Sequence, residues 1–140
     1  MRYLLPALLA WVIAQALKVV VVSVRRRRLD FRAWAETGGM PSSHSAMVAA
    51  LTTAVGRVDG LASSTFAIAV IFSFVVMYDA QGVRRAAGLQ AAILNRLVDD
   101  LMAHRGIEET RLRELLGHTP VEVLVGAALG IGVGLVPFGL

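Results

Sequence analysis

The sequence opens with an apolar segment that is long enough to cross a lipid bilayer as a helix. Tyr3 to Val24 contains a single charged residue, Lys18, and a bilayer core needs about 20 residues of helix. A cleaved signal peptide would have a basic start and a cleavage site. Here only Arg2 precedes the segment, and four arginines, Arg25 to Arg28, stand where the cleavage site belongs. We therefore expect a membrane-spanning helix.

Three further apolar segments follow along the chain. They are Ser43 to Val58, which is short, the uncharged Leu61 to Tyr78, and Thr119 to Leu140, which carries only Glu122. Hydrophobic residues make up 56% of the chain, charged residues only 17%, and the mean hydropathy is +0.67. This composition is too apolar for a soluble domain. The pattern predicts an all-α, multi-pass transmembrane helical bundle of about four spans, forming one domain over residues 1–140.

A charged section, Asp79 to Gly117, separates the third and fourth segments. Within it apolar residues recur at helical spacing: Val83, Ala87, Leu94, Leu97 and Leu101. This predicts an amphipathic helix over Gln81 to Ala103 that continues the third span or lies on the membrane interface. The residues from His104 to His118 indicate a loop followed by a short helix.

Loop charge predicts the orientation. Arginines concentrate in Arg25 to Arg32 and in the section after Asp79, whereas the loop near Asp59 is short and nearly neutral. The positive-inside bias places both long loops in the cytoplasm and both termini outside, in the inner or plasma membrane of a cell. Arginines that bind a substrate would bias this count.

Composition also excludes some partners. The chain has no cysteine, so neither a disulfide framework nor a thiolate metal site is available. Nucleic-acid binding needs a basic surface on a suitable fold, whereas the basic residues here are flanked by apolar, membrane-like segments. We predict no nucleic-acid partner, no metal and no cofactor.

Small residues mark one face of the last apolar segment. Gly126, Gly130 and Gly134 form a GxxxGxxxG row, and small residues let helices approach closely in lipid. The row predicts a packing seam, either against another helix of the chain or against a second subunit. A homodimer through this face is one expectation.

Polar residues of several segments converge on one membrane face. His44 begins the second apolar segment and His118 precedes the fourth, so two crossings separate them and both lie at the same face. Lys18 and Arg25 end the first segment two helical turns apart, on one side of the helix. Arg84 and Arg85 follow the third segment, again at that face.

Each of these features also has a local explanation. Ser42 and Ser43 after Pro41 are ordinary helix N-cap residues. Thr119 to Glu122, TPVE, is a capping box. Lys18 can extend its ammonium group to the interface, the arginine run is a topology signal, and Asp79 can pair with Arg84 or Arg85.

The joint pattern favours a phosphate ligand. Two helix N-termini beside lysine and arginine side chains form an anion site. Of two histidines, one can attack phosphorus while the other protonates the leaving oxygen. Glu122, four residues after His118, can orient that imidazole, and cations and backbone amides can stabilise the transition state without a metal.

These motifs resemble the phosphatidic-acid-phosphatase type 2 and vanadium-haloperoxidase superfamily, and more closely its small divergent bacterial and plant branch. The superfamily's three motifs correspond here to Lys18-x6-Arg25, to PSSH ending at His44, and to His118-x3-Glu122. YDAQGVRRAAG, from Tyr78, is similar to a signature of the divergent branch. This sequence departs from the superfamily pattern at four positions: Arg26 replaces proline, Ser43 glycine, Leu112 arginine and Glu122 aspartate.

The resemblance implies an all-helical, metal-independent phosphatase. By it, His118 is the nucleophile that forms a phosphohistidine, Glu122 orients it, and His44 is the general acid. Phosphate binding falls to six further residues, with Arg84 or Arg85 supplying the cation that Leu112 does not: Lys18, Arg25, Ser42, Ser43, Arg84 and Arg85. The substrate is a lipid phosphate, with phosphatidic acid, phosphatidylglycerol phosphate and isoprenyl phosphates or diphosphates all open.

Two alternatives stay open. The first is a non-catalytic membrane protein that keeps the phosphate or lipid-headgroup site, which the altered third motif favours. The second is a haloperoxidase, which is less favoured because those relatives are soluble. The superfamily has six spans and this chain about four, so part of the usual pocket is missing or comes from a second subunit.

Overall fold

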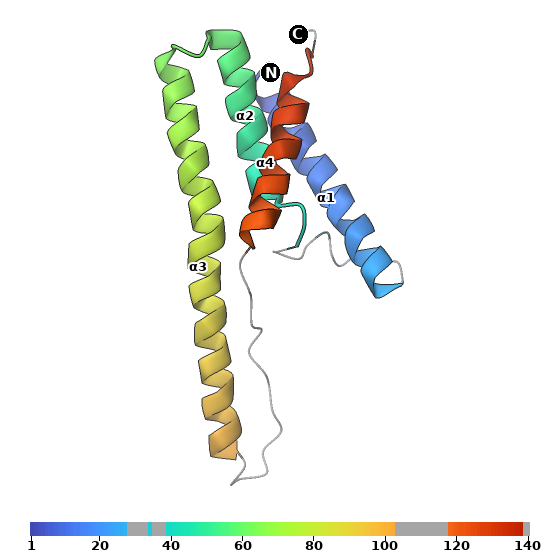
Figure 1. Ribbon diagram of the computed structural model, residues 1–140, viewed down its shortest axis with the longest axis vertical. Coiled ribbons are helices and arrows are strands. Elements are labelled where there is room, and N and C mark those ends of the chain that lie inside the picture. Colours follow the sequence, from blue (N-terminus) through green and yellow to red (C-terminus); the bar gives the residue numbers. More distant parts are fainter. Residues whose placement is uncertain (28–33, 35–38, 103–117, 139–140) are drawn as a thin grey trace.

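The computed structural model describes residues 1–27, 34, 39–102 and 118–138; for residues 82–87, 89 and 100–102 it describes the backbone alone. These residues form four α-helices: α1 Leu4–Arg26, α2 Ser43–Asp59, α3 Ser64–Met102 and α4 Pro120–Leu135. Every regular element in the described part of the chain is a helix, which agrees with the all-α prediction. Figure 1 shows α1, α2 and α4 grouped together, with α3 running beside α2.

Helix α2 is the centre of the bundle because the other three helices all pack on it. Its contact with α4 is the closest. A Cβ on Gly126 would meet the backbone of Ser42, one on Gly130 would meet the carbonyl oxygen of Ala46, and one on Gly134 would lie 2.7 Å from the Cβ of Thr53. The glycine row is therefore a packing seam within one chain, covered by α2. Because α2 covers this glycine face, it is not free for the predicted homodimer contact. A homodimer remains a prediction and would need another surface.

Alanines line the contact between α1 and α2. Ala10 and Ala14 of α1 and Ala46 and Ala50 of α2 are fully buried and form one cluster. Short side chains allow the helix backbones to approach, as is usual between helices in lipid.

Hydroxyl groups connect α2 to α3. Thr52 donates to the carbonyl oxygen of Ala69 (3.1 Å) and lies 2.7 Å from the hydroxyl of Ser73, which also contacts the carbonyl oxygen of Val48 (3.0 Å). Ser73 is buried. Hydrogen bonds of this kind hold helices together where water is absent.

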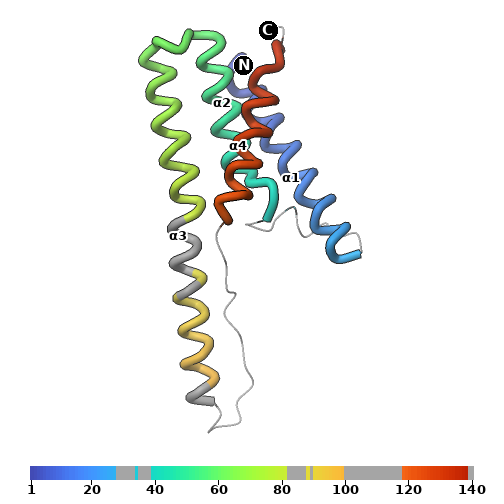
Figure 2. Tube along the Cα trace, viewed as in Figure 1, coloured from blue at the N-terminus to red at the C-terminus, as the bar shows by residue number. Residues whose placement is uncertain are grey.

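The first half of α3 follows the bundle, and the second half extends beyond it (Figure 1). The amphipathic segment predicted over Gln81 to Ala103 thus continues the third apolar segment as one helix of 39 residues. Of the two alternatives for that segment, continuation of the third apolar segment is therefore the one that the structure shows. The loop and short helix predicted over His104 to His118 lie outside the described residues, apart from His118 itself (grey in Figure 2).

The apolar segments predict the helices closely, but two boundaries are wrong. The third helix begins at Ser64 rather than Leu61, after a turn in which Gly60 has a φ of +87° and the Ser63 hydroxyl accepts from the amide of Phe66. The fourth helix ends at Leu135 rather than Leu140. Its next residue, Val136, is extended (φ −68°, ψ 125°) because a following proline, Pro137, disfavours helical backbone.

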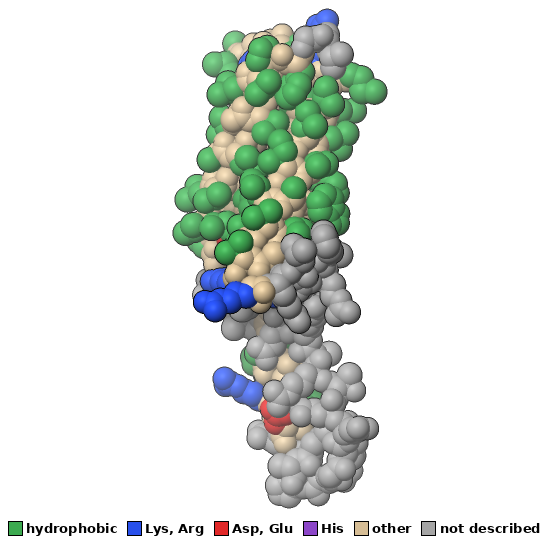
Figure 3. Space-filling view, turned by 90° about the vertical axis from the view of Figure 1, so that its right-hand side faces the viewer, with side chains coloured by type: hydrophobic (Ala, Val, Ile, Leu, Met, Phe, Trp, Pro, Cys, Tyr) green, Lys and Arg blue, Asp and Glu red, His purple; other side chains and the backbone are tan. Residues whose placement is uncertain are grey.

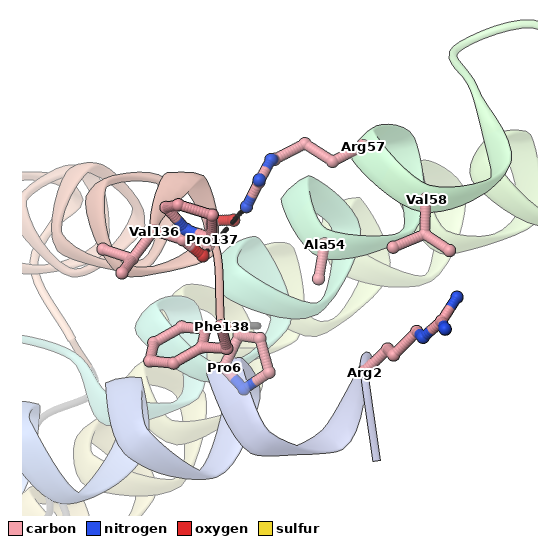
Figure 4. Close-up of a pocket in the computed structure, with 9 residues that line it drawn as sticks. Arg2, Pro6, Ala54, Arg57, Val58, Val136, Pro137 and Phe138 are labelled. Atoms are coloured by element: carbon pink, nitrogen blue, oxygen red, sulfur yellow. Dashed lines mark hydrogen bonds between the residues drawn. The ribbon is translucent and has the colours of Figure 1, made fainter. Parts of the chain in front are cut away.

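At the end of the bundle that holds both termini, side chains fasten the helix ends to each other. Arg57 of α2 donates to the carbonyl oxygens of Gly134 (3.1 Å) and Val136 (2.9 Å), which satisfies the end of α4. This contact borders a cleft of about 280 Å³ that Arg2 and Phe138 also line (Figure 4). Tyr3 donates to Asp59 (2.6 Å), and this hydrogen bond raises the pKa of the Tyr3 hydroxyl above its ordinary value.

Large apolar side chains cover the outside of the bundle, and basic side chains lie below them (Figure 3). Many are more than half exposed, among them Leu8, Val20, Ile68, Ile71, Phe72, Phe74 and Leu124. Within the described residues, α1 and residues Ser64–Gln81 of α3 are long and apolar enough to cross a membrane, and α4 is a shorter apolar helix. An apolar belt of this size is typical of a surface that contacts lipid or another protein.

Candidate functional site

The N-termini of α2 and α4 lie next to each other, at the end of the bundle opposite to the chain termini (Figure 1). The amide of Ser42 donates to the carbonyl oxygen of Glu122 over 3.1 Å. Both helices begin with a hydroxyl cap: the Ser42 hydroxyl accepts from the amide of Ser45, and Thr119 accepts from the amide of Glu122. The positive ends of two helix dipoles therefore meet here, which favours an anion.

The two histidines meet at this junction. The ring centroids of His44 and His118 are 6.3 Å apart, with the ring planes at 63°. The prediction that both lie at one face of the bundle is confirmed, because each belongs to the start of one of two adjacent helices. His118 is also fixed to α3, since its amide donates to the carbonyl oxygen of Ala80 (3.2 Å).

Glu122 serves the helix cap and the histidine together. One of its oxygens accepts from the amide of Thr119 (2.9 Å) and lies 3.3 Å from Nδ1 of His118. A carboxylate accepts hydrogen bonds, so in this contact Nδ1 carries the hydrogen and the lone pair of the neutral imidazole lies on Nε2. The predicted capping box is confirmed, and it is compatible with orientation of the imidazole. The side chain of His118 is only 1% exposed.

Lys18 and Arg25, which belong to the continuous helix α1, have different surroundings. Lys18 is 2% exposed, and a Cβ on Gly39 would lie 3.7 Å from its Cγ, so its stem packs under the segment that leads into α2. Gly39 has a φ of +88°, a conformation that favours glycine. Arg25 is exposed in the last turn of α1 and lines a groove with Thr119 and Glu122.

The structure thus brings together six of the nine predicted site residues at one end of the bundle: Lys18, Ser42, Ser43, His44, His118 and Glu122. Arg25 lies at the edge of this group. Arg84 and Arg85 belong to α3, but their side chains, and with them the predicted pairing of Asp79, lie outside the described part. Leu112 and the arginines that flank it are also outside it.

Two residues of this region were missed by sequence reasoning. Gln15 is 8% exposed, and its side-chain amide donates to the carbonyl oxygen of Trp34 (2.9 Å), so it supports the segment between α1 and α2. The signal was available, because a polar residue within a spanning segment usually has a partner. Ala80 contributes only its carbonyl group, which no side-chain pattern reveals.

Comparisons with known proteins identify the family. The family model of the divergent PAP2 family matches residues 1–133. The uncharacterized membrane protein YuiD of Bacillus subtilis (strain 168) is 44% identical over 144 residues, covering 95% of this chain and 91% of that protein. No solved structure gives a significant match. With the paired histidines of PSSH and HTPVE at the junction of α2 and α4, the chain belongs to the divergent PAP2 family.

Proposed function

We propose that the chain is an integral membrane phosphatase that hydrolyses a phosphomonoester or diphosphate of a lipid through a phosphohistidine intermediate. The observation that carries this proposal is the histidine pair, 6.3 Å apart, with a carboxylate on one ring. A nucleophile approaches its target atom to about 3–3.5 Å, and a general acid needs a hydrogen bond of about 2.6–3.2 Å. These distances are measured from ring nitrogens, and a centroid separation of 6.3 Å puts the two imidazoles on the scale of a single phosphoryl group.

His118 is the nucleophile in this scheme. Nδ1 faces Glu122, so Nε2 attacks the phosphorus atom, and the bond between phosphorus and the ester oxygen breaks. The carboxylate stabilises the positive charge that develops on the ring. Burial of the ring excludes bulk water from the nucleophile before the substrate binds.

His44 handles the protons of both steps. As the imidazolium it donates a proton to the leaving oxygen, which departs as the lipid alcohol or, from a diphosphate, as the lipid monophosphate. As the neutral base it then takes a proton from water, which attacks the phosphohistidine and breaks the bond between nitrogen and phosphorus. Inorganic phosphate leaves, and both histidines return to their starting states.

Charge on the transferred phosphoryl group falls to the cations and helix N-termini around the pair. Lys18, Arg25 and the hydroxyl and amide of Ser43 hold the phosphate, with Arg84 or Arg85 as the further cation. Preorganised donors of this kind stabilise the charge that develops in the transition state.

We further propose that all four helices cross the membrane and that the site faces the cytoplasm. Helices α2 and α4, of 17 and 16 residues, extend about 24–26 Å, slightly less than a bilayer core of about 30 Å. They lie beside the two longer apolar helices, and a small mismatch is accommodated by local thinning. The arginine-rich end of α1 then marks the cytoplasmic side.

A second candidate function is binding of a phosphate or lipid headgroup without turnover. Two observations favour it: Leu112 occupies the position of the superfamily's arginine, and the side chain of His118 is almost fully buried. Both functions use the same residues, so only turnover distinguishes them.

Phosphate release from a panel of lipid phosphates tests the proposal. The panel contains phosphatidic acid, phosphatidylglycerol phosphate, and isoprenyl phosphate and diphosphate, presented to the purified protein in mixed micelles. We expect release from at least one substrate, reduced on the order of 10³-fold or more in His118→Ala. His104→Ala, which changes the one histidine of the chain outside the proposed pair, is the matched control and should keep the wild-type rate.

The other outcomes are equally informative. Equal release by wild type and His118→Ala would reject His118 as the nucleophile. No release from any substrate, with retained binding of a lipid phosphate, would replace the phosphatase by the second candidate.

A further inference from the structure

A groove of about 620 Å³ lies between the last turns of α1 and the start of α4. Figures 1 and 2 show the reason for it: α1 and α4 are close near the chain termini and diverge toward the other end. Along α1 the wall is apolar, with Val20, Val21 and Val24 exposed, and Val121 lines it on α4. The groove therefore opens sideways, on the apolar outer surface of the bundle.

Polar residues line the same groove and make it continuous with the candidate site. They are Arg25, Thr119 and Glu122. Glu122 is the residue whose carboxylate contacts His118, and Gly39 and Met40, which also line the groove, lead directly into the capped start of α2.

The burial of His118 restricts how a substrate can reach it. With 1% of its side chain exposed, the ring offers almost no surface to water. In the groove, a molecule arriving from the bilayer meets the Arg25 guanidinium and the Glu122 carboxylate that contacts this ring.

We infer that this groove admits the lipid substrate sideways from the bilayer, an inference that rests on the proposed function. The apolar chain lies against the valines of α1 and Val121, and the phosphate lies beside Arg25 before it reaches the histidines. A groove lined by valines and by one arginine matches an amphiphile with an anionic headgroup, and its volume is within the range of ligand sites.

A second groove provides the natural comparison. It has a volume of about 570 Å³ between α2, α3 and α4, and its lining is almost entirely apolar. None of the predicted site residues lines it, and it reaches Arg57 at the opposite end of the bundle. Because its lining contains neither a histidine of the pair nor Glu122, we assign the substrate to the groove between α1 and α4.

Two matched substitutions separate the grooves. Val21 lines the first and Val70 the second, and their exposures are 39% and 41%. In the His118→Ala background, which prevents turnover, each valine is changed to tryptophan. Labelling is measured with phosphatidic acid that carries a photoreactive diazirine in one acyl chain, in phosphatidylcholine vesicles. We expect Val21→Trp to lower labelling about tenfold, the loss produced by one blocked hydrophobic contact region, and Val70→Trp to leave it unchanged.

Further measurements test whether each variant is folded and whether labelling depends on the phosphate of the probe. Val24→Trp repeats the test at a more exposed position, and the thermal unfolding midpoint of each variant verifies that it is folded. Arg25→Gln should lower labelling by the phosphatidic acid probe but not by the matching diacylglycerol probe, which lacks the phosphate.

The outcomes distinguish this inference from the proposed function. Loss of labelling with Val70→Trp instead of Val21→Trp and Val24→Trp, or labelled peptides from α2 and α3 only, would overturn the groove assignment. Turnover by an otherwise wild-type protein with Val21→Trp at the normal rate would do the same while leaving the phosphatase intact. Labelling that depends on Val21, in a protein that hydrolyses no substrate, would support the groove and reject the phosphatase.

Discussion

Glu122 combines the two compatible roles that the sequence suggests for it. Its carboxylate accepts from the amide of Thr119 and also contacts Nδ1 of His118. The first contact caps α4, and the second fixes the tautomer of the ring. Because a cap and an orienting carboxylate need different chemistry from the same atom, one substitution can separate them.

Glu122→Gln is that substitution. Glutamine also serves in a capping box, so the unfolding midpoint should change little, with a cost below about 1 kcal/mol. The negative charge next to His118 is lost, and we expect kcat to fall about 10²-fold or more. The measurement is lipid phosphate hydrolysis together with thermal unfolding of the same preparation.

Thr119→Val provides the control, because it removes the cap hydroxyl and leaves the carboxylate. It should cost about 1 kcal/mol of stability and change kcat much less than Glu122→Gln does. A Glu122→Gln protein with full activity would show that the carboxylate has only its capping role.

At this scale the sequence predicts the site well where residues are close along the chain. The spacing from His118 to Glu122 fixes their contact, because residues four apart share a helix face. The count of crossings predicts that His44 and His118 lie at the same end of the bundle, and their contact also depends on the packing of α4 on α2. The support from Gln15 and Gly39 could not be predicted, because it depends on the path of the segment between α1 and α2.

At the scale of helices, the packing of α4 on α2 dominates the fold. The row of Gly126, Gly130 and Gly134 predicts a close approach, and the structure adds which helix approaches. Sequence alone cannot supply that partner, because small residues indicate how near a neighbour comes and not which neighbour it is. The fourth helix also ends early for a local reason, the proline at position 137.

Gly130→Ala tests this seam. The new Cβ would meet the carbonyl oxygen of Ala46 and lie 2.9 Å from the Cβ of Ala49, so the backbones must separate. Overpacking of this kind costs about 1–3 kcal/mol, measured as a lower unfolding midpoint in detergent. Gly132→Ala is the matched control, because nothing lies within 4 Å of its Cβ position. It should be neutral or stabilising by up to about 1 kcal/mol. Equal losses in the two variants would contradict the seam.

For the whole molecule, the arrangement of ends follows from the alternation of the helices. The two termini and the turn between α2 and α3 lie at one end of the bundle, and the N-termini of α2 and α4 lie at the other (Figure 1). The histidine pair belongs to these two helix starts. Segment lengths and loop charge predict this arrangement because each crossing reverses the chain. The extension of α3 past the bundle is one of two structures that the amphipathic pattern allows. The pattern alone does not determine whether the helix continues straight or turns to lie on the membrane interface.

Sidedness follows from this arrangement and is tested with single cysteines. The chain has no native cysteine, so Asp59→Cys and Gln90→Cys introduce unique thiols at exposed positions near the two ends. In intact cells a membrane-impermeant maleimide should label residue 59 and leave residue 90 unlabelled until the membrane is opened. Labelling of both thiols from the same side would contradict the proposed crossing pattern.

The most direct test of the account is isolation of the covalent intermediate. The purified protein is mixed with a lipid phosphate that carries a radiolabelled phosphoryl group and is quenched within one turnover in alkali, which preserves phosphohistidine. We predict an alkali-stable, acid-labile label on the peptide that contains His118, and none in His118→Ala. A protein that releases phosphate at the same rate with and without His118, and that carries no label in either form, would contradict the account.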